Sequence, residues 1–262
     1  MSQATRERQD RILAEVLHAR HVTVSELADR LAVSEATVRR DLRVLSEDRK
    51  LQLVHGGATL PRNTDFSFQA KGTRNVDAKR RIAALAATLI ADGEQIFLDS
   101  GTTCFEICPY LHAKRGLSVI ANSARLALEL ENPTPAMILL GGQYRSDRQD
   151  TIGPIAVSTL QQLRGYLAFI GADGLSMDFG PSASDVDSAH LNRLAIENAR
   201  EVILLADQSK FESPALFRIV EWEAIGRLIT DRPPEPAWQE FLASHDIEVL
   251  WPEHPDARTE AA

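Results

Sequence analysis

Cysteine and long apolar runs are both scarce in this chain of 262 residues. Its two cysteines, Cys104 and Cys108, stand one helical turn apart, and no histidine or cysteine cluster nearby completes a metal site. We predict buried thiols with no disulfide, metal or cofactor. The longest apolar stretches, such as 137–140 and 202–206, are far below the roughly 20 residues of a membrane-spanning helix. The charged residues at 6–11 exclude a signal peptide, so we expect a cytoplasmic protein with no membrane partner.

Positive charge is also in short supply, since the net charge is −8. Its distribution is uneven, because residues 1–60 hold ten Lys and Arg against nine Asp and Glu, whereas the rest of the chain holds nineteen against twenty-eight. Nucleic-acid binding therefore cannot come from a broadly basic surface. It requires a local cluster, and the N-terminal part offers one in its arginines.

What the N-terminal part does contain is the pattern of two short amphipathic helices separated by a tight turn near Ala32. Thr23 followed by Glu26 has the form of a capping box, and Ser34 stands where the second helix needs an acceptor for its free amides. The apolar positions with helical spacing on the two sides of the turn are Leu27, Ala28, Leu31, Val33, Val38, Leu42 and Leu45.

If those apolar positions face inward, the outer face of the second helix is polar and basic. Such a helix fits the major groove of DNA, where arginines reach phosphates or guanine. Asp41 is better suited to orient an arginine or the first helix than to read a base. The outer face is left to Glu35, Thr37, Arg39, Arg40 and Arg43.

The runs LADRLAVSEATVRRDLRVL and LVHGGATL resemble the N-terminal domain of the DeoR family of bacterial transcriptional regulators. The resemblance implies that the second helix is the recognition helix and that the HGGA segment closes a small β wing. Two positions depart from the family pattern, Arg49 at a wing-turn glycine and Leu53 at an arginine, although Arg49 and Lys50 could replace the missing charge. We predict DNA contacts from Ser34, Glu35, Thr37, Arg39, Arg40, Arg43 and His55.

The chain after the wing predicts a second domain of the α/β class. We expect a winged helix-turn-helix domain at 1–60, a linker at 61–76 and a Rossmann-like α/β domain at 77–255, built on a parallel sheet that is covered on both faces. Expected helices are 77–91, 104–111, 125–130, 155–163, 187–199 and 238–244. Expected strands are 95–99, 117–121, 137–140, 167–170, 202–206, 228–230 and 248–251.

Small and hydroxyl-bearing residues follow nearly every expected strand. Ligands of open parallel sheets bind at the carboxyl ends of the strands, so this pattern predicts a polar ligand site. The sharpest turn is Ser100-Gly101-Thr102-Thr103, where helix-start amides and three hydroxyls suit a phosphate. It is neither a P-loop nor a dinucleotide fingerprint, because the required glycine spacing is missing.

This second domain also resembles the DeoR family, in the segments IFLDSGTT, GADGL and LLADQSKF. The resemblance implies a fold similar to ribose-5-phosphate isomerase and the CoA transferases, and a phosphorylated sugar or related metabolite as effector. Asn192 stands where many members have a lysine, which implies an effector of different charge or shape. The predicted effector-binding residues are Ser100, Gly101, Thr102, Thr103, Asn122, Ser123, Gly141, Gly142, Asp173 and Lys210.

Together the two domains predict a transcriptional repressor of a carbohydrate catabolism operon, with double-stranded operator DNA and a phosphorylated sugar as partners. A homodimer or homotetramer would place two reading heads on one DNA. Two alternatives stay open. One is a sugar-phosphate isomerase or CoA transferase that carries a DNA-binding head, with Asp99, Asp173 or Asp207 as base or nucleophile. The other is an architectural DNA-binding protein whose α/β domain only oligomerises.

Overall fold

The computed structural model describes residues 5, 8–9, 11–13, 15–16, 21–47, 51–54, 56–59, 68–130, 135–211 and 214–253. The chain divides into two compact units, Met1–Lys71 and Gly72–Ala262. This division falls inside the range 61–76 that we expected as a linker, and a short helix, α4 (Phe68–Gly72), lies in the same range. Among the described residues, no helix combines the length and apolar character that a membrane span requires.

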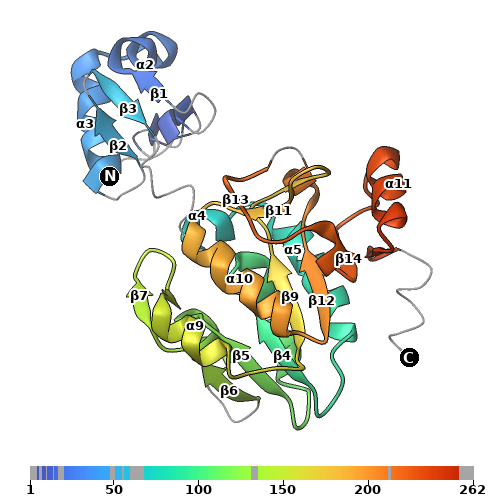
Figure 1. Cartoon of the computed structure of the whole chain (residues 1–262). Helices are drawn as coiled ribbons and strands as arrows, with labels where there is room; N and C mark the ends of the chain where they lie inside the picture. Colours follow the sequence, from blue (N-terminus) through green and yellow to red (C-terminus); the bar gives the residue numbers. More distant parts are fainter. Residues whose placement is uncertain are drawn as a thin grey trace. The chain divides into compact units, whose positions relative to one another are not determined.

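Among the described residues, the N-terminal unit has helical residues between positions 5 and 16, two further helices that follow them, and a three-stranded antiparallel sheet (Figure 1). Helix α2 (Val24–Leu31) is followed by α3 (Glu35–Glu47), and the strands β1 (His21–Thr23), β2 (Gln52–Val54) and β3 (Gly57–Thr59) pair in the order β1-β3-β2. The helix-turn-helix and the wing hairpin are thus present as predicted. Their small core holds Leu27, Val38, Leu42 and Leu45, all at most 1% exposed.

The C-terminal unit is built on a seven-stranded sheet whose neighbouring strands are all parallel. The strand order is β15-β14-β12-β9-β4-β5-β6. The strands are β4 (Gln95–Leu98), β5 (Ser118–Ala121), β6 (Ala136–Leu139), β9 (Leu167–Gly171), β12 (Glu201–Leu205), β14 (Arg227–Ile229) and β15 (Glu248–Leu250). The predicted α/β class with a parallel sheet is confirmed.

Helices cover both faces of this sheet, because successive strand residues alternate between two buried apolar clusters (Figure 1). In β4, for example, Phe97 packs in one cluster whereas Ile96 and Leu98 pack in the other. The first cluster is completed by α9 (Pro154–Leu160), α10 (Val186–Asn198) and α11 (Pro236–Ser244). The second is completed by α5 (Val76–Thr88), α6 (Thr102–Phe105), α7 (Cys108–Leu111) and α8 (Ala124–Glu129).

The sequence patterns missed several small elements. The expected helix 104–111 is two short helices, α6 and α7, and Pro109 stands at the second position of α7. Both cysteines are free thiols and fully buried, and burial raises the pKa of Cys108 to about 12. Unpredicted strands form a hairpin, β7 (Gln143–Arg145) with β8 (Asp150–Ile152), and a small sheet of β10 (Gly174–Ser176), β11 (Gly180–Ala183) and β13 (Phe217–Arg218).

Candidate functional site

The capping residues predicted from the sequence hold the starts of α2 and α3. Thr23 and Glu26 form a reciprocal capping box, in which the Thr23 hydroxyl accepts from the Glu26 amide at 3.2 Å and the Glu26 carboxylate accepts from the Thr23 amide at 2.9 Å. Ser34 Oγ accepts from the Thr37 amide at 3.3 Å at the start of α3. Ala32 takes a left-handed conformation (φ 53°) at the turn. These caps fix the angle at which α3 leaves the turn.

The polar face of α3 is exposed and carries the predicted arginines. Arg39 forms an ion pair with Glu35 one turn earlier, at 2.8 Å, and both side chains are about half exposed. Arg40 and Arg43 are exposed and make no ion pair with any residue that the structure describes. Thr37 is half-buried, and its hydroxyl lies 3.0 Å from the Ser34 hydroxyl. Within the described residues, these two arginines without an ion pair lie on one helix face, where they suit the phosphates of DNA.

Asp41 lies on the opposite, buried side of α3. It is 2% exposed and accepts hydrogen bonds from Arg8 at 2.5 and 3.2 Å and from Gln9 at 3.3 Å. These contacts agree with the expectation that Asp41 is a partner of an arginine or of the first helix. The ion pair joins residues 33 positions apart and so fastens α3 to the N-terminal segment.

The wing depends on a close approach of backbones at Gly57. A β-carbon there would lie 2.0 Å from the Val22 carbonyl oxygen, so no other residue fits. Leu53, which stands where the resemblance implies an arginine, is 43% exposed on β2. Arg49, Lys50 and the predicted DNA contact His55 lie outside the described residues.

In the second unit, the predicted effector residues gather where the strand order reverses. The chain runs from β4 outward to β5 and β6 and then returns to β9 on the other side of β4. Such a switch point is where open parallel sheets bind ligands, at the carboxyl ends of the strands. Asp99 ends β4 here and is 8% exposed, and its carboxylate accepts from the Gly171 amide at the end of β9 at 3.2 Å.

The Ser100–Thr103 turn leaves this switch point and enters α6. Ser100 Oγ donates to the Asp150 carboxylate at 3.2 Å. Gly101 is the residue before the helix, and a β-carbon on it would lie 2.9 Å from Asp99 Oδ2. Thr102 and Thr103 are both buried, 8% and 7% exposed. Of the four predicted phosphate ligands, Ser100 and Gly101 are thus the more accessible.

An ion-pair network, which the sequence did not reveal, lies beside Ser100. Asp150, 1% exposed, accepts from Arg145 Nε at 2.8 Å and from Arg145 Nη2 at 2.6 Å. Arg145 also donates to Asp185 at 2.8 Å, and Arg148 forms a second ion pair with Asp185. Hydrogen bonds from Ser188 and the charges of both arginines lower the pKa of Asp185, against burial, which raises it. The network ties the β7–β8 hairpin to α10 and the end of β4.

The end of β5 is held by the same hairpin. Asn122 Nδ2 donates to the Thr151 carbonyl at 2.9 Å, whereas Asn122 Oδ1 is buried without a hydrogen-bond partner in the part of the chain that the structure describes. Ser123 caps α8 through the Leu126 amide at 3.3 Å. Gly141 and Gly142 lie before β7, and Gly142 has a structural role of its own, since a β-carbon there would lie 2.5 Å from the Ile152 carbonyl oxygen.

The last two predicted effector residues lie on other strand ends. Asp173 follows β9 and accepts from the Ser184 amide at 2.9 Å. Lys210 lies in the short helix η1 (Gln208–Phe211) after β12, which is separated from β4 by β9. Among the described residues, no hydrogen bond joins Lys210 to the other predicted effector residues. The structure thus gathers the residues after β4, β5 and β9 and places Lys210 farther along the sheet.

Asn192 proves to be a neighbour of Asp99. It is 5% exposed on α10, and its side chain lies close enough to the Asp99 carboxylate to lower the pKa of that group. The pKa of Asp99 is raised to about 6, because burial and the charges of Asp173 and Asp150 together outweigh the lowering by the Gly171 amide and by Asn192. A neutral amide thus stands beside a buried carboxylate where the resemblance implies a cation.

Comparison with known families gives two matches that together cover most of the chain. Residues 8–64 match the DeoR-like helix-turn-helix domain, and residues 74–232 match the DeoR C terminal sensor domain. The first contains α2, α3 and the wing, and the second contains every predicted effector residue.

Three similar proteins match this chain over nearly their whole length. The HTH-type transcriptional regulator GlpR of Haloferax volcanii is 31% identical, over 93% of this chain and 96% of its own. The HTH-type transcriptional repressor CsqR of Escherichia coli is 32% identical, over 94% and 95%. The Glycerol-3-phosphate regulon repressor of Escherichia coli is 29% identical, over 93% and 97%.

Among solved structures, ribose 5-phosphate isomerase A of Methanocaldococcus jannaschii aligns with a TM-score of 0.39 at 22% identity, over 52% of this chain and 55% of that one. The translation initiation factor eIF-2B of Pyrococcus horikoshii aligns with a TM-score of 0.41 at 21% identity, over 59% and 62%.

Proposed function

Since this chain belongs to the DeoR family of transcriptional regulators, we propose that it represses a carbohydrate catabolism operon and that a phosphorylated sugar bound at the β4–β9 switch point alters its affinity for the operator. The chain is a DNA-binding regulator by family. We propose, beyond this, the class of its effector, the residues that contact DNA and effector, and the direction of the response.

On the DNA side, the proposed contacts are the exposed groups of α3, with Ser34 and Glu35 at its start. Arg40 and Arg43 are unpaired among the described residues and take phosphates or guanine edges, whereas Arg39 first has to leave Glu35. A nearly neutral head with few free cations binds weakly by itself. We therefore propose a homodimer or homotetramer, which binds two half-sites spaced by turns of about 34 Å.

On the effector side, one observation carries the proposal: Asn122 Oδ1, at the end of β5, is buried and has no hydrogen-bond partner among the described residues. A buried acceptor without a donor costs roughly 1–3 kcal/mol, so the site favours a ligand that supplies hydroxyl groups. Ser100 lies on the neighbouring strand end, and both residues are held by β8, through Asp150 and Thr151. A sugar hydroxyl at Asn122 leaves its phosphate near Ser100, Gly101 and the first amides of α6.

The experiment is a titration of operator binding with sugar phosphates. Full-length protein is bound to labelled DNA from upstream of its own gene cluster, and glycerol 3-phosphate, ribose 5-phosphate and hexose phosphates are added in turn. A coupling free energy of about 1–3 kcal/mol changes operator affinity by about 5- to 150-fold. Asn122→Asp is expected to abolish the response without weakening DNA binding, because it adds a negative charge beside the phosphate. DNA binding that no sugar phosphate changes would contradict the effector proposal.

One observation favours a second function, isomerisation of a sugar phosphate. Asp99 is buried and its pKa is raised to about 6, as for a general base that works near neutrality. However, an enediolate intermediate is anionic, and the groups facing Asp99 are Asp173, Asp150 and Asn192, while the two nearby arginines are paired with Asp150 and Asp185. We expect no turnover of ribose 5-phosphate by the full chain; turnover that Asp99→Asn removes would establish the enzyme.

A further inference from the structure

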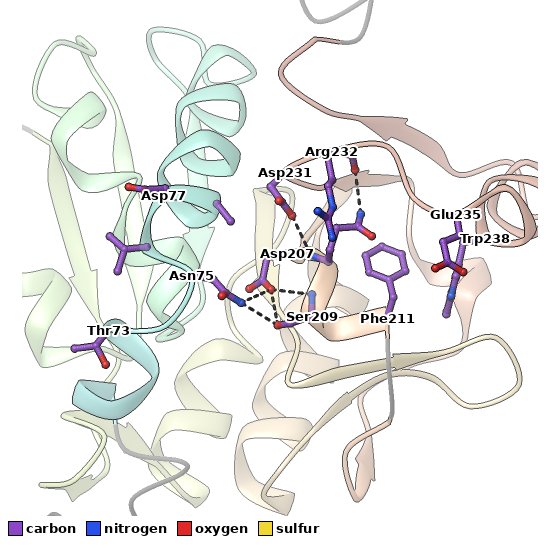
Figure 2. A pocket seen from close by; sticks show the side chains of 13 residues that line it. Thr73, Asn75, Asp77, Asp207, Ser209, Phe211, Asp231, Arg232, Glu235 and Trp238 are labelled. Carbon is purple, nitrogen blue, oxygen red and sulfur yellow. Dashed lines mark hydrogen bonds between the residues drawn. The ribbon is translucent and has the colours of Figure 1, made fainter. Parts of the chain in front are cut away.

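A cavity of about 820 Å³ lies at a different part of the sheet, at the carboxyl ends of β12 and β14 (Figure 2). The first turn of α5 forms one wall, and η1 with the segment before α11 forms the other. Its volume falls in the range of small-molecule sites. None of the ten predicted effector residues lines it. It is therefore distinct from the switch point between β4 and β9.

The floor of the cavity holds a buried carboxylate with one unused oxygen. Asp207 is 2% exposed, and its Oδ1 accepts from Asn75 Nδ2 at 2.9 Å, from the Ser209 amide at 3.0 Å and from the Ser209 hydroxyl at 2.5 Å (Figure 2). Its Oδ2 is buried and has no hydrogen-bond partner in the described part of the chain. A buried carboxylate oxygen favours a charged donor above all others. Asp207 lines the cavity, so a donor bound there lies beside this carboxylate.

The charges around the cavity select the sign of the ligand. Asp77, Asp231 and Glu235 join Asp207 on the lining, and Arg232 is the one basic side chain among the described residues that line the cavity. Asp231 is itself engaged, by the Gln208 amide at 2.9 Å and by the guanidinium of Arg81 at 3.5 Å. A phosphate at this place meets net negative charge, whereas a cation is attracted. Among the described residues, no three His, Cys, Asp or Glu side chains could hold a metal ion, which leaves an organic cation.

The remaining wall is aromatic. Phe211 and Trp238 meet edge to face with ring centroids 5.0 Å apart, and both line the cavity. Such a wall suits the hydrocarbon part of a ligand and adds attraction for a cation near the ring faces.

We propose that this cavity binds a primary amine, whose ammonium donates to Asp207 Oδ2 while its hydrocarbon part packs on Phe211 and Trp238. Glu235, exposed at the start of α11, adds attraction at the rim. The site adjoins the first residues of the C-terminal unit, because Asn75, which shares Asp207 with the ligand, follows Lys71 by four positions.

The test is calorimetric titration of the full chain with butylamine and, as its neutral isostere, butanol. Butylamine is expected to bind at one site per chain and about tenfold or more tightly than butanol, because hydrogen bonds to charged groups contribute about 1.5–3 kcal/mol. Asp207→Asn is expected to remove this preference. Glu235→Gln, an exposed change that leaves the fold intact, is expected to weaken butylamine about two- to threefold.

Two control variants separate this site from general charge and from the effector site. Asp92→Asn removes the same charge from the turn before β4, at the amino ends of the strands, and is expected to leave butylamine binding unchanged. Ser100→Ala is likewise expected to leave it unchanged, so that failure of the sugar-phosphate proposal and failure of this one are distinguishable. Equal affinity for butylamine and butanol, no binding of either, or equal weakening by Asp92→Asn would each overturn the amine site.

Discussion

The two units use charge in opposite ways. On α3 of the N-terminal unit, Arg39 and Glu35 are 60% and 48% exposed, and they pair within one helical turn. At the switch point of the C-terminal unit, Arg145 and Asp150 are 16% and 1% exposed, and their network extends to α10. Exposed cations are free to bind a polyanion, whereas buried pairs fasten strand ends and respond to a ligand only by exchanging partners.

Exposed and buried ion pairs also differ in how much they contribute to the free energy of unfolding. An exposed ion pair contributes about 0–1 kcal/mol, because water and salt compete with it. Removing one partner of a buried pair costs about 3–5 kcal/mol, because the other charge remains without compensation. Substitutions in the C-terminal unit should therefore change stability, and substitutions on α3 should change DNA binding instead.

The largest expected effect is that of Arg145→Ala. It leaves Asp150 buried without its guanidinium and removes one of the two arginines at Asp185, so we expect the free energy of unfolding to fall by about 3 kcal/mol or more. Urea unfolding followed by tryptophan fluorescence measures it. The matched control is Arg115→Ala, because Arg115 is 92% exposed and its pair with Asp92 lies at 3.4 Å. Equal losses in the two variants would erase the distinction between buried and exposed pairs.

The next effect is a pH dependence that comes from Asp99. Its pKa in the folded protein is raised from 3.8 to about 6, so the folded state binds its proton more tightly than the unfolded state does. The stabilisation is complete below the lower pKa and is lost as the pH rises through the higher one, by roughly 3 kcal/mol in all.

The measurement is the difference in unfolding free energy between the wild-type protein and Asp99→Asn across this range of pH. Subtraction removes the contributions of the other carboxylates. The wild type should lose stability relative to the variant as the pH rises from about 4 to about 7. A difference that stays constant with pH would show that Asp99 is not held in a buried site beside other carboxylates.

Asp41 allows buried and exposed ion pairs to be compared within the N-terminal unit, because Asp41 is buried in its pair with Arg8, whereas the pair of Glu35 with Arg39 is exposed. Asp41→Asn keeps an acceptor for Arg8 but removes the charge, and Arg8 remains 24% exposed, so we expect a loss of about 1–2 kcal/mol. Hydrogen exchange of the α3 amides measures this locally. Glu35→Gln on the same helix is the control and should leave exchange unchanged. If both variants speed exchange equally, burial does not decide the value of a pair in this unit.

Local pattern predicted much of the fold. Period and capping located α2, α3 and their turn, because each cap joins residues three positions apart, Thr23 with Glu26 and Ser34 with Thr37. Alternation of apolar strands with helices located every strand of the parallel sheet. The β7–β8 hairpin was missed, because Gln143–Arg145 is short, polar and exposed and carries no apolar alternation.

The two candidate sites also differ in how much of each a local sequence pattern predicts. The exposed face of α3 follows from helical spacing alone. At the switch point, Ser100 meets Asp150 and Asn122 meets Thr151 across separations of 50 and 29 residues, which no local pattern records. The sequence offers Asp207 as a strand-end carboxylate, but the cavity that it lines together with Asn75, 132 residues away, follows only from the fold.

The smallest expected effect is on DNA binding, and it distinguishes the exposed face of α3 from the rest of the surface of the N-terminal unit. Arg40→Ala should weaken operator binding about tenfold and reduce the slope of log affinity against log salt by about 1, because one phosphate contact is lost. Stability should not change, since Arg40 is exposed. Fluorescence anisotropy at several salt concentrations measures both quantities. The control is Arg30→Ala on α2, which removes an equally exposed arginine, paired with Glu15, from outside the reading face. Equal loss from Arg30→Ala would mean that the head binds DNA by total charge, and the exposed face of α3 would then have no special claim to the major groove.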